Sequence, residues 1–251
     1  MNAARRGSSP PPLPATVDDN PSAAARALSQ ILERSARVQG PAVEAYVRRL
    51  RRANPDASPA DMVTKLEKRY LAAVTASGAA VGSAAAVPGI GTLAALSAVA
   101  GETVVFLEAT AVFVLAVAEV HGIPARHREW RRALVLAVLV GEDSKHAIAD
   151  LVGPSRTRGA WLSESAVSLP LPAVSQLNNR LLKYFVRRYA LRRGTIAFGK
   201  MLPMGIGAIV GGGGNRLMGK KIIGNARKAF GPPPNRWPVS LLVLPTAREA
   251  D

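Results

Sequence analysis

The sequence predicts an all-α protein, a multi-helix bundle built around closely packed Gly- and Ala-rich helices. Three observations support this prediction. No segment alternates apolar and polar residues with the strand period of two over a useful length. Several segments carry apolar residues at helical spacing and are bounded by capping and proline signals. Residues 71–101 contain no charged side chain and are mostly Ala, Gly and other small residues.

The sequence of residues 1–57 predicts a tail followed by two short helices. Residues 1–20 are Pro-rich and lack apolar periodicity, so we expect them to be disordered. Proline signals at Asn20-Pro21 and Gly40-Pro41 each predict a helix start. We therefore expect residues 21–57 to form an N-terminal helical pair ahead of a larger helical domain, residues 58–230.

The long uncharged segment predicts a helical hairpin. Ser58-Pro59-Ala60-Asp61 is a helix start, because Ser58 can cap the helix and Asp61 lies near the positive end of its dipole. Pro88-Gly89-Ile90-Gly91 divides the uncharged segment, so we expect two helices joined by a tight turn. The second runs from Thr92 to Val120, and His121-Gly122-Ile123-Pro124 ends it with a glycine and a following proline.

Three further helices are expected, at Pro124 to Val140, Val174 to Arg193 and Pro203 to Phe230. Residues 152–172 are broken by Gly and Pro and predict loops with a short helix. The helix from Val174 is amphipathic, with one apolar face made of Val174, Leu177, Leu181 and Phe185. Gly231-Pro232-Pro233-Pro234 ends the last helix, and we expect residues 231–251 to form a Pro-rich C-terminal tail.

Two of these helices carry glycines on one face, as in a glycine zipper. The first helix has Gly78 and Gly82, and the second has Gly207, Gly211 and Gly219. Residues four apart share a helix face, so each helix offers a smooth groove for close approach. A mid-helix Gly costs about 1 kcal/mol relative to Ala, so a compensating contact is expected. We predict that the two grooved helices pack on each other. The grooves could serve packing in a membrane setting or, alternatively, tight helix packing in a wholly soluble bundle.

The positive charge is concentrated in the C-terminal third. Residues 165–248 hold 14 of the 33 Lys and Arg residues and none of the 17 Asp and Glu residues. An unbalanced positive field attracts polyanions, such as an anionic leaflet, nucleic acid or an acidic partner. We predict that this region contacts anionic lipid headgroups, and the candidate residues are Arg180, Lys183, Arg187, Arg188, Arg192, Arg193, Lys220 and Lys221.

One helix raises the question of insertion into a bilayer. Residues 103–120 are strongly apolar but contain Glu108 and Glu119, which are eleven residues apart and so share one face. A charge at mid-bilayer costs roughly 3 kcal/mol. We expect these two glutamates to form a buried polar stripe in a bundle interior or shallow membrane site, and integral insertion stays open. Residues 1–20 carry no secretory signal, so we expect the cytoplasmic face of the membrane.

Composition and spacing give no support for a catalytic site. The chain has no cysteine, which excludes disulfides, thiolate ligands and a cysteine nucleophile. It has three histidines, His121, His127 and His146. Gly214 to Lys221 nearly matches a P-loop, but Lys221 replaces the Ser or Thr that would hold magnesium. No spacing matches a zinc or di-iron motif. We expect no catalytic residue, metal or cofactor; a carboxylate-based hydrolase remains an alternative, favoured if a cleft gathers Glu108 or Glu119 with a histidine.

Three segments resemble the EcsC protein family: Ala84 to Gly89, His121 to Pro124 and Lys200 to Asn215. The similarity covers roughly residues 60–230. It is most specific from Lys200 through Pro203, Gly207 and Gly211 to Asn215. The resemblance implies a bacterial helical protein linked to the membrane and, in the namesake case, encoded alongside an ABC-type transporter. It implies no catalytic residues.

These features together predict a membrane-associated helical accessory protein of the cytoplasmic face, non-catalytic and linked to transporter function or membrane homeostasis. Its expected partners are anionic membrane lipids and, through the resemblance, an ABC-type transporter. A soluble basic helical protein that binds nucleic acid non-specifically is the main alternative, since such binding requires only Lys and Arg along a surface.

Overall fold

The structure, a computed structural model, describes residues 41–85, 92–123, 127–142, 144, 162, 170–200 and 206–238. These residues form helices and no strand, which confirms the all-α prediction. A helix over residues 41–52 is followed by α2 (Pro59–Ala85), α3 (Thr92–Val120), α4 (Arg128–Val140), α7 (Leu171–Lys200) and α8 (Ile206–Phe230). The expected tail over residues 1–20, the first expected helix, the Pro88–Gly91 turn and residues 239–251 lie outside the described part of the chain.

α2 begins at the predicted capping signal. The Asp61 carboxylate accepts hydrogen bonds from the Ser58 N–H at 3.0 Å and from the Ser58 hydroxyl at 2.7 Å. The Ser58 Oγ in turn accepts from the Asp61 N–H at 3.2 Å, so the two residues satisfy each other as a capping box. The hydrogen bonds from Ser58 lower the pKa of Asp61.

α3 ends at Val120, as predicted, in a Schellman motif. The Ile123 N–H donates to the Ala118 carbonyl at 2.9 Å, and the Gly122 N–H donates to the Glu119 carbonyl at 3.0 Å. Gly122 has φ +71°, a left-handed conformation that glycine adopts without a steric penalty. The glycine and its neighbours therefore determine the helix end locally.

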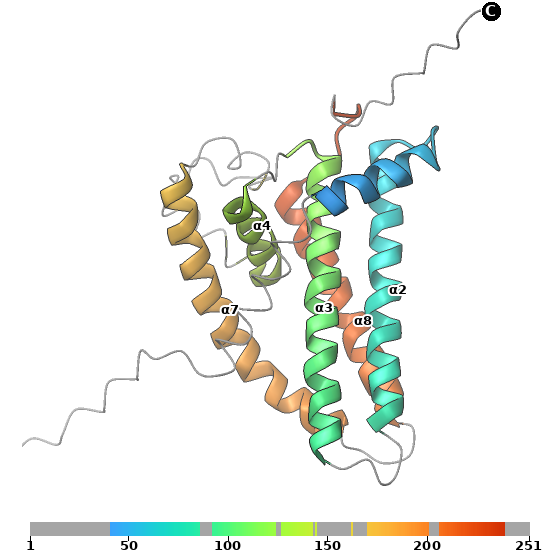
Figure 1. Ribbon diagram of the computed structural model, residues 1–251, viewed down its shortest axis with the longest axis vertical. Helices are drawn as coiled ribbons and strands as arrows, with labels where there is room; N and C mark the ends of the chain where they lie inside the picture. The colour runs from blue at the N-terminus through green and yellow to red at the C-terminus, as the bar shows by residue number, and fades with distance from the viewer. Residues whose placement is uncertain are drawn as a thin grey trace, which may run out of the picture.

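Figure 1 shows α2 on one side of α3 and α4 and α7 on the other, while α8 runs obliquely behind α3 from the α2 side to the α4 side. α2 and α3 run antiparallel, and α8 packs along α2 in the most extensive helix pair of the described chain. α4 and α7 pack on each other and lie on the opposite side of α3. α3 is thus the central helix.

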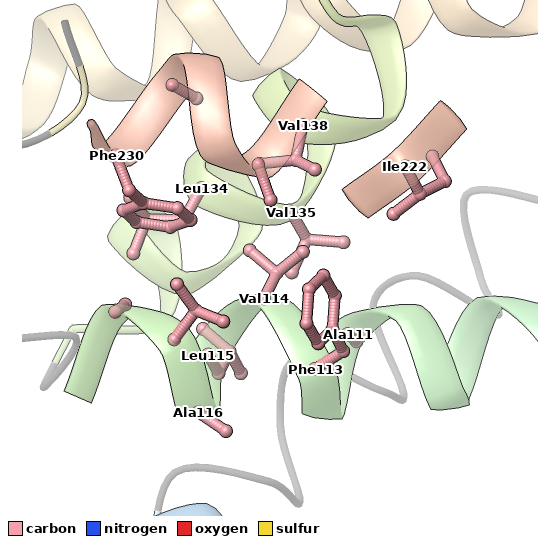
Figure 2. Close-up of a cluster of buried hydrophobic side chains, with 14 of the residues drawn as sticks. Ala111, Phe113, Val114, Leu115, Ala116, Leu134, Val135, Val138, Ile222 and Phe230 are labelled. Atoms are coloured by element: carbon pink, nitrogen blue, oxygen red, sulfur yellow. The ribbon is translucent and has the colours of Figure 1, made fainter. Parts of the chain in front are cut away.

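The core forms where α3, α4 and α8 meet (Figure 2). Residues 113–118 of α3 are all buried, which requires neighbours on every side. Val114 faces side chains of α4, while Ile222 and Phe230 of α8 complete the cluster. The helix over residues 41–52 adds its own apolar side chains to the same core, namely Val43, Val47 and Leu50.

α8 is also tied to its neighbours by two asparagine side chains. The Asn215 amide is buried, and its Nδ2 donates to the Val74 carbonyl of α2 at 3.0 Å. The Asn225 Nδ2 donates to the Val138 carbonyl of α4 at 2.9 Å. α8 therefore contacts two helices through main-chain carbonyl groups as well as through apolar side chains.

α4 and α7 depart from their predicted bounds. α4 begins at Arg128 rather than Pro124, because His127 is extended, with φ −83° and ψ 137°. α7 runs over Leu171–Lys200, beyond both ends of the predicted range. Its predicted apolar face is buried, made of Val174, Leu177, Leu181 and Phe185. The Asn178 Nδ2 beside that face donates to the Glu129 carboxylate of α4 at 2.8 Å.

Candidate functional site

One face of α8 combines positive charge with exposure. At 100° per residue, six exposed side chains fall within about half of the helix circumference. α8 contains no Asp or Glu. We call this surface the α8 basic face, made of Arg216, Leu217, Lys220, Lys221, Arg227 and Lys228.

The opposite side of α8 fixes the orientation of this face. A Cβ added at Gly212 would lie 3.2 Å from the Cβ of Ala79, and one at Gly219 would lie 3.0 Å from side chains of Leu71 and Val74. Both glycines are buried, so the α8 and α2 backbones approach closely there. Packing against α2 turns the α8 basic face away from the core.

Leu217 is the most exposed large apolar side chain in the described part of the chain, at 70%. Single exposed apolar side chains are common, but this one is surrounded by cations on the same face. A Cβ added at Gly213 or Gly224, also on that side, would meet no atom within 4 Å. The middle of the α8 basic face is therefore an open surface with one apolar side chain among positive charges.

Acidic residues of α2 and of the turn after α4 balance the C-terminal end of this face. Arg227 Nε and Nη2 donate to the two carboxylate oxygens of Glu67 at 2.7 and 2.5 Å, a bidentate pair that raises the pKa of Arg227. Lys228 Nζ lies 2.9 Å from the Glu142 carboxylate. The cations nearer the middle of α8 are Arg216, Lys220 and Lys221.

The predicted lipid-contact residues divide between two helices. Arg180 and Lys183 are exposed on α7, and Lys220 and Lys221 are exposed on α8. The remaining four belong to α7, but their side chains lie outside the described residues: Arg187, Arg188, Arg192 and Arg193.

The predicted lipid-contact residues do not include Arg216 and Leu217, which share a face with the two lysines. Each lies four residues before one of them, at Lys220 and Lys221. A helical projection of the predicted α8 segment would have grouped all four residues.

The described part of the α2–α8 contact includes one of the predicted α8 glycines and one that was not predicted. Gly78 and Gly82 are buried in α2, and Gly219 lies at the contact described above. The surroundings of Gly207 and Gly211 are outside the described residues. Gly212, which the four-residue spacing did not select, also approaches α2, seven residues before Gly219.

The predicted buried polar stripe on α3 is wrong. Glu108 is exposed and Glu119 is only half-buried, whereas Glu102 is the buried acid, at 1% exposure. The reason is that both glutamates lie on the side of α3 that carries the exposed Gly101 and Val105. The N-terminal half keeps an open side that includes Gly101, Val105 and Glu108.

Gly101–Val120 is the one helix in the described chain that is long and apolar enough to cross a membrane. Its mean hydropathy is 2.1, and 61% of the segment is buried within the fold. A helix at the centre of a bundle also needs an apolar surface on all sides. Its composition is therefore explained by its place in the core.

Neither a metal site nor the proposed carboxylate–histidine cleft is formed by the described residues. No group of three or more His, Asp or Glu side chains among them could hold a metal ion. His121 lines a cavity together with Glu67, but neither Glu108 nor Glu119 lines it. The condition that favoured a hydrolase is therefore not met by those two glutamates.

No family model, curated protein or solved structure matches the chain. The resemblance to the EcsC family therefore rests on the sequence segments alone. The α8 basic face is the structural feature on which a functional proposal depends.

Proposed function

We propose that this protein is a non-catalytic helical accessory protein that binds anionic lipid headgroups at the cytoplasmic face of the membrane. The observation that carries the proposal is the arrangement around Leu217, an apolar side chain 70% exposed among cations on a helix without acidic residues. An interfacial helix has this combination of an apolar anchor and surrounding positive charge.

The magnitudes support reversible attachment. Each Lys or Arg close to an anionic leaflet contributes about 1 kcal/mol, so Arg216, Lys220 and Lys221 together contribute about 3 kcal/mol. Burying a leucine side chain contributes about 1.5 to 3 kcal/mol more. These contributions act together and require no lipid anchor.

Charge also argues against a second copy of the chain as the occupant of this face. Two copies meeting through the α8 basic face would bring like charges together, which destabilises an interface. An anionic surface is complementary to the positive charges of Arg216, Lys220 and Lys221.

The EcsC resemblance is part of the proposal. It adds a functional link to membrane transport or membrane homeostasis, with an ABC-type transporter as a candidate protein partner. Lipid binding through the α8 basic face would place the protein next to such a partner.

Sedimentation with vesicles tests the lipid interaction. The full chain is mixed with vesicles of phosphatidylcholine alone or with 30% phosphatidylglycerol, at low and high salt. We expect binding only to the anionic vesicles, weakened by salt because salt screens exposed charges. The triple variant Arg216→Gln, Lys220→Gln, Lys221→Gln should bind about a hundredfold more weakly, which corresponds to about 3 kcal/mol.

Two matched variants separate this face from total charge. Arg48→Gln, Arg49→Gln, Arg52→Gln removes three exposed cations from the helix over residues 41–52 and should leave binding nearly unchanged. Leu217→Ser should weaken binding, whereas Leu171→Ser, at a residue 45% exposed on α7, should not. Equal losses of vesicle binding in the two triple variants would refute the proposal.

The nucleic-acid alternative is tested with the same variants. A gel shift with a short DNA duplex reports non-specific binding, which falls steeply with salt. If the chain binds the duplex tightly and does not bind anionic vesicles, the protein is a nucleic-acid binder and the membrane proposal is wrong.

A further inference from the structure

Four helix ends meet at one end of the bundle (Figure 1). Gly212, near the start of α8, lies against α2 near its end, because a Cβ on this glycine would be 3.2 Å from the Cβ of Ala79. Residues 86–91 join the end of α2 to the start of α3, and residues 201–205 join the end of α7 to the start of α8. These short connections keep the start of α3 and the end of α7 at the same end of the molecule.

The helix surface at this end carries no exposed charge among the described residues. Residues 71–101 and 201–215 contain no charged side chain except at their borders, where Arg69, Glu102 and Arg216 follow or precede them. We call the described surface here the uncharged end, made of Ala76, Ala80, Ser83, Gly101, Val105 and Gly213, all of which are exposed. The surface of a soluble domain is ordinarily about a quarter to a third charged, so this composition favours an apolar neighbour.

The two connections at this end are also apolar in sequence. Residues 86–91 are Ala-Val-Pro-Gly-Ile-Gly and residues 201–205 are Met-Leu-Pro-Met-Gly, with no polar side chain in either. Loops between helices are ordinarily polar, as in the turn before α2 at the opposite end, which contains Asn54, Asp56 and Ser58. Both connections lie outside the described residues, and their composition agrees with that of the uncharged end.

Exposed cations border the uncharged end on α2 and α8. The Asn215 side chain donates to the Val74 carbonyl, so the exposed Arg216 stands at the level of Val74. Lys220 follows one helical turn later on α8, and the exposed Arg69 is the last charged residue of α2 before the uncharged end. An apolar end bordered by cations is complementary to an anionic membrane, whose phosphates lie just outside its hydrocarbon.

The two acidic residues in this half of α3 do not expose charge at the uncharged end. The Tyr70 hydroxyl lies 2.9 Å from the Thr110 Oγ1, so Thr110 is level with the first residues of the uncharged part of α2. Glu108 precedes Thr110 by about 3 Å along the axis and therefore lies at the border, near the cations. Glu102 lies deeper in the end, but it is only 1% exposed.

Hydroxyl groups in the uncharged part of α2 are satisfied within the helix. The Thr75 hydroxyl donates to the Leu71 carbonyl at 2.6 Å, and the exposed Ser83 hydroxyl donates to the Ala79 carbonyl at 2.8 Å. Polar groups that enter hydrocarbon need such internal partners. Residues 76–85 of α2 rise about 15 Å, which is half of a hydrocarbon core about 30 Å thick.

We infer that the uncharged end inserts into one leaflet of an anionic bilayer, with Arg69, Arg216 and Lys220 at the level of the lipid phosphates. This inference rests on the proposed function and extends it from headgroup contact to insertion. α7 also ends there, at Lys200, and long cationic side chains near a membrane extend their charged groups to the interface, which suits a shallow insertion. A second copy fits this end less well, because it would bring the bordering cations together.

A single fluorescent label tests the insertion, because the chain has no cysteine to remove. Ala80→Cys carries an environment-sensitive NBD label at the uncharged end. Ala60→Cys is the matched control, also exposed on α2 and about 30 Å away. With vesicles containing 30% phosphatidylglycerol, we expect blue-shifted emission at Ala80→Cys. Nitroxides on the acyl chains should quench this label at least threefold more than the label at Ala60→Cys.

The other outcomes of this experiment are decisive as well. If both labelled proteins sediment with the vesicles but the Ala80→Cys label stays in water, insertion is wrong and headgroup binding stands. If neither protein sediments with them, the proposed function and this inference both fail. A blue shift that grows with protein concentration in the absence of vesicles would show self-association through this end and overturn the inference.

Two double variants with the same change in charge give a second readout. Ala76→Asp, Ala80→Asp places two carboxylates at the uncharged end, whereas Ala45→Asp, Ala60→Asp places them elsewhere; all four positions are exposed. We expect the first pair to bind anionic vesicles at least tenfold more weakly than the second, with circular dichroism and urea unfolding as checks of the fold. If the two double variants bind equally well, the uncharged end does not enter the bilayer.

Discussion

The side chain of Asn225 lies directly against Gly141, so that a Cβ on Gly141 would be 2.7 Å from the amide nitrogen. The same nitrogen donates to the Val138 carbonyl in the last turn of α4. Gly141 has φ +81° and ψ −140°, a conformation that is almost exclusive to glycine. The end of α4 and the contact with α8 are therefore built on a single glycine.

Gly141→Ala should lower the free energy of unfolding by about 2 to 4 kcal/mol, from backbone strain and from displacement of the Asn225 amide. Urea denaturation measures the change. The double variant Gly141→Ala, Asn225→Ala should lose less free energy of unfolding than the sum of the losses in the two single variants, because both substitutions act on the same contact. Full additivity would show that the two residues do not interact.

Gly219→Ala and Gly213→Ala should have opposite effects on the free energy of unfolding. At Gly213 the added methyl group meets nothing within 4 Å, so the higher helix propensity of Ala should stabilise the fold by up to about 1 kcal/mol. At Gly219 it would press on Leu71 and Val74 at 3.0 Å and cost about 1 kcal/mol net. Thermal and urea unfolding of the two variants would show a difference of about 2 kcal/mol; similar stabilities would refute the close α2–α8 approach.

Asn215→Ala should destabilise the fold by about 2 kcal/mol, because it removes a buried hydrogen bond to Val74 and leaves a small void. Asn179→Ala, at an exposed position on α7, is the control and should change stability by less than about 0.5 kcal/mol. Urea unfolding distinguishes them. Equal effects would mean that the buried amide contributes nothing specific.

His121 predicts a pH dependence of stability. Burial lowers its pKa below the value of 6.5 that it has in the unfolded chain, so the unfolded state binds the proton more readily. The stability contribution of neutral His121 is complete above about pH 6.5 and is lost as the pH falls toward its lower folded-state pKa. The free energy of unfolding should therefore fall more between about pH 7.5 and pH 5 in the parent chain than in His121→Phe. Parallel pH profiles in both proteins would contradict this assignment.

The helix ends that could be predicted are those encoded by adjacent residues. The Ser58 and Asp61 capping pair and the glycine at 122 act within a few positions, and both ends were found where local chemistry places them. The start of α4 was misplaced, because Pro124 is an equally good local signal but His127 is extended. Local signals thus give the helix ends only where no other local signal competes with them.

The parts that could not be predicted depend on which helices meet. Glu108 and Glu102 both lie on α3, and the first is exposed while the second is buried because they lie on different sides of the helix. The cavity at His121 gathers residues from three helices and from the segment after α8, so no spacing in the sequence marks it. The α8 basic face was partly predictable, because its lysines stood out in an acid-free region while Arg216 and Leu217 required the helical projection.

The two asparagines of α8 have a consequence for sliding along the bundle axis. A helix rich in Gly and Ala has a smooth surface, and moving it by one turn, about 5.4 Å, would exchange one set of small contacts for a similar one. The amides of Asn215 and Asn225 have no such equivalents, because each is matched to one carbonyl on a different helix. The two hydrogen bonds therefore fix the position of α8 along the bundle axis. They thereby also fix where Arg216, Lys220 and Lys221 lie along that axis.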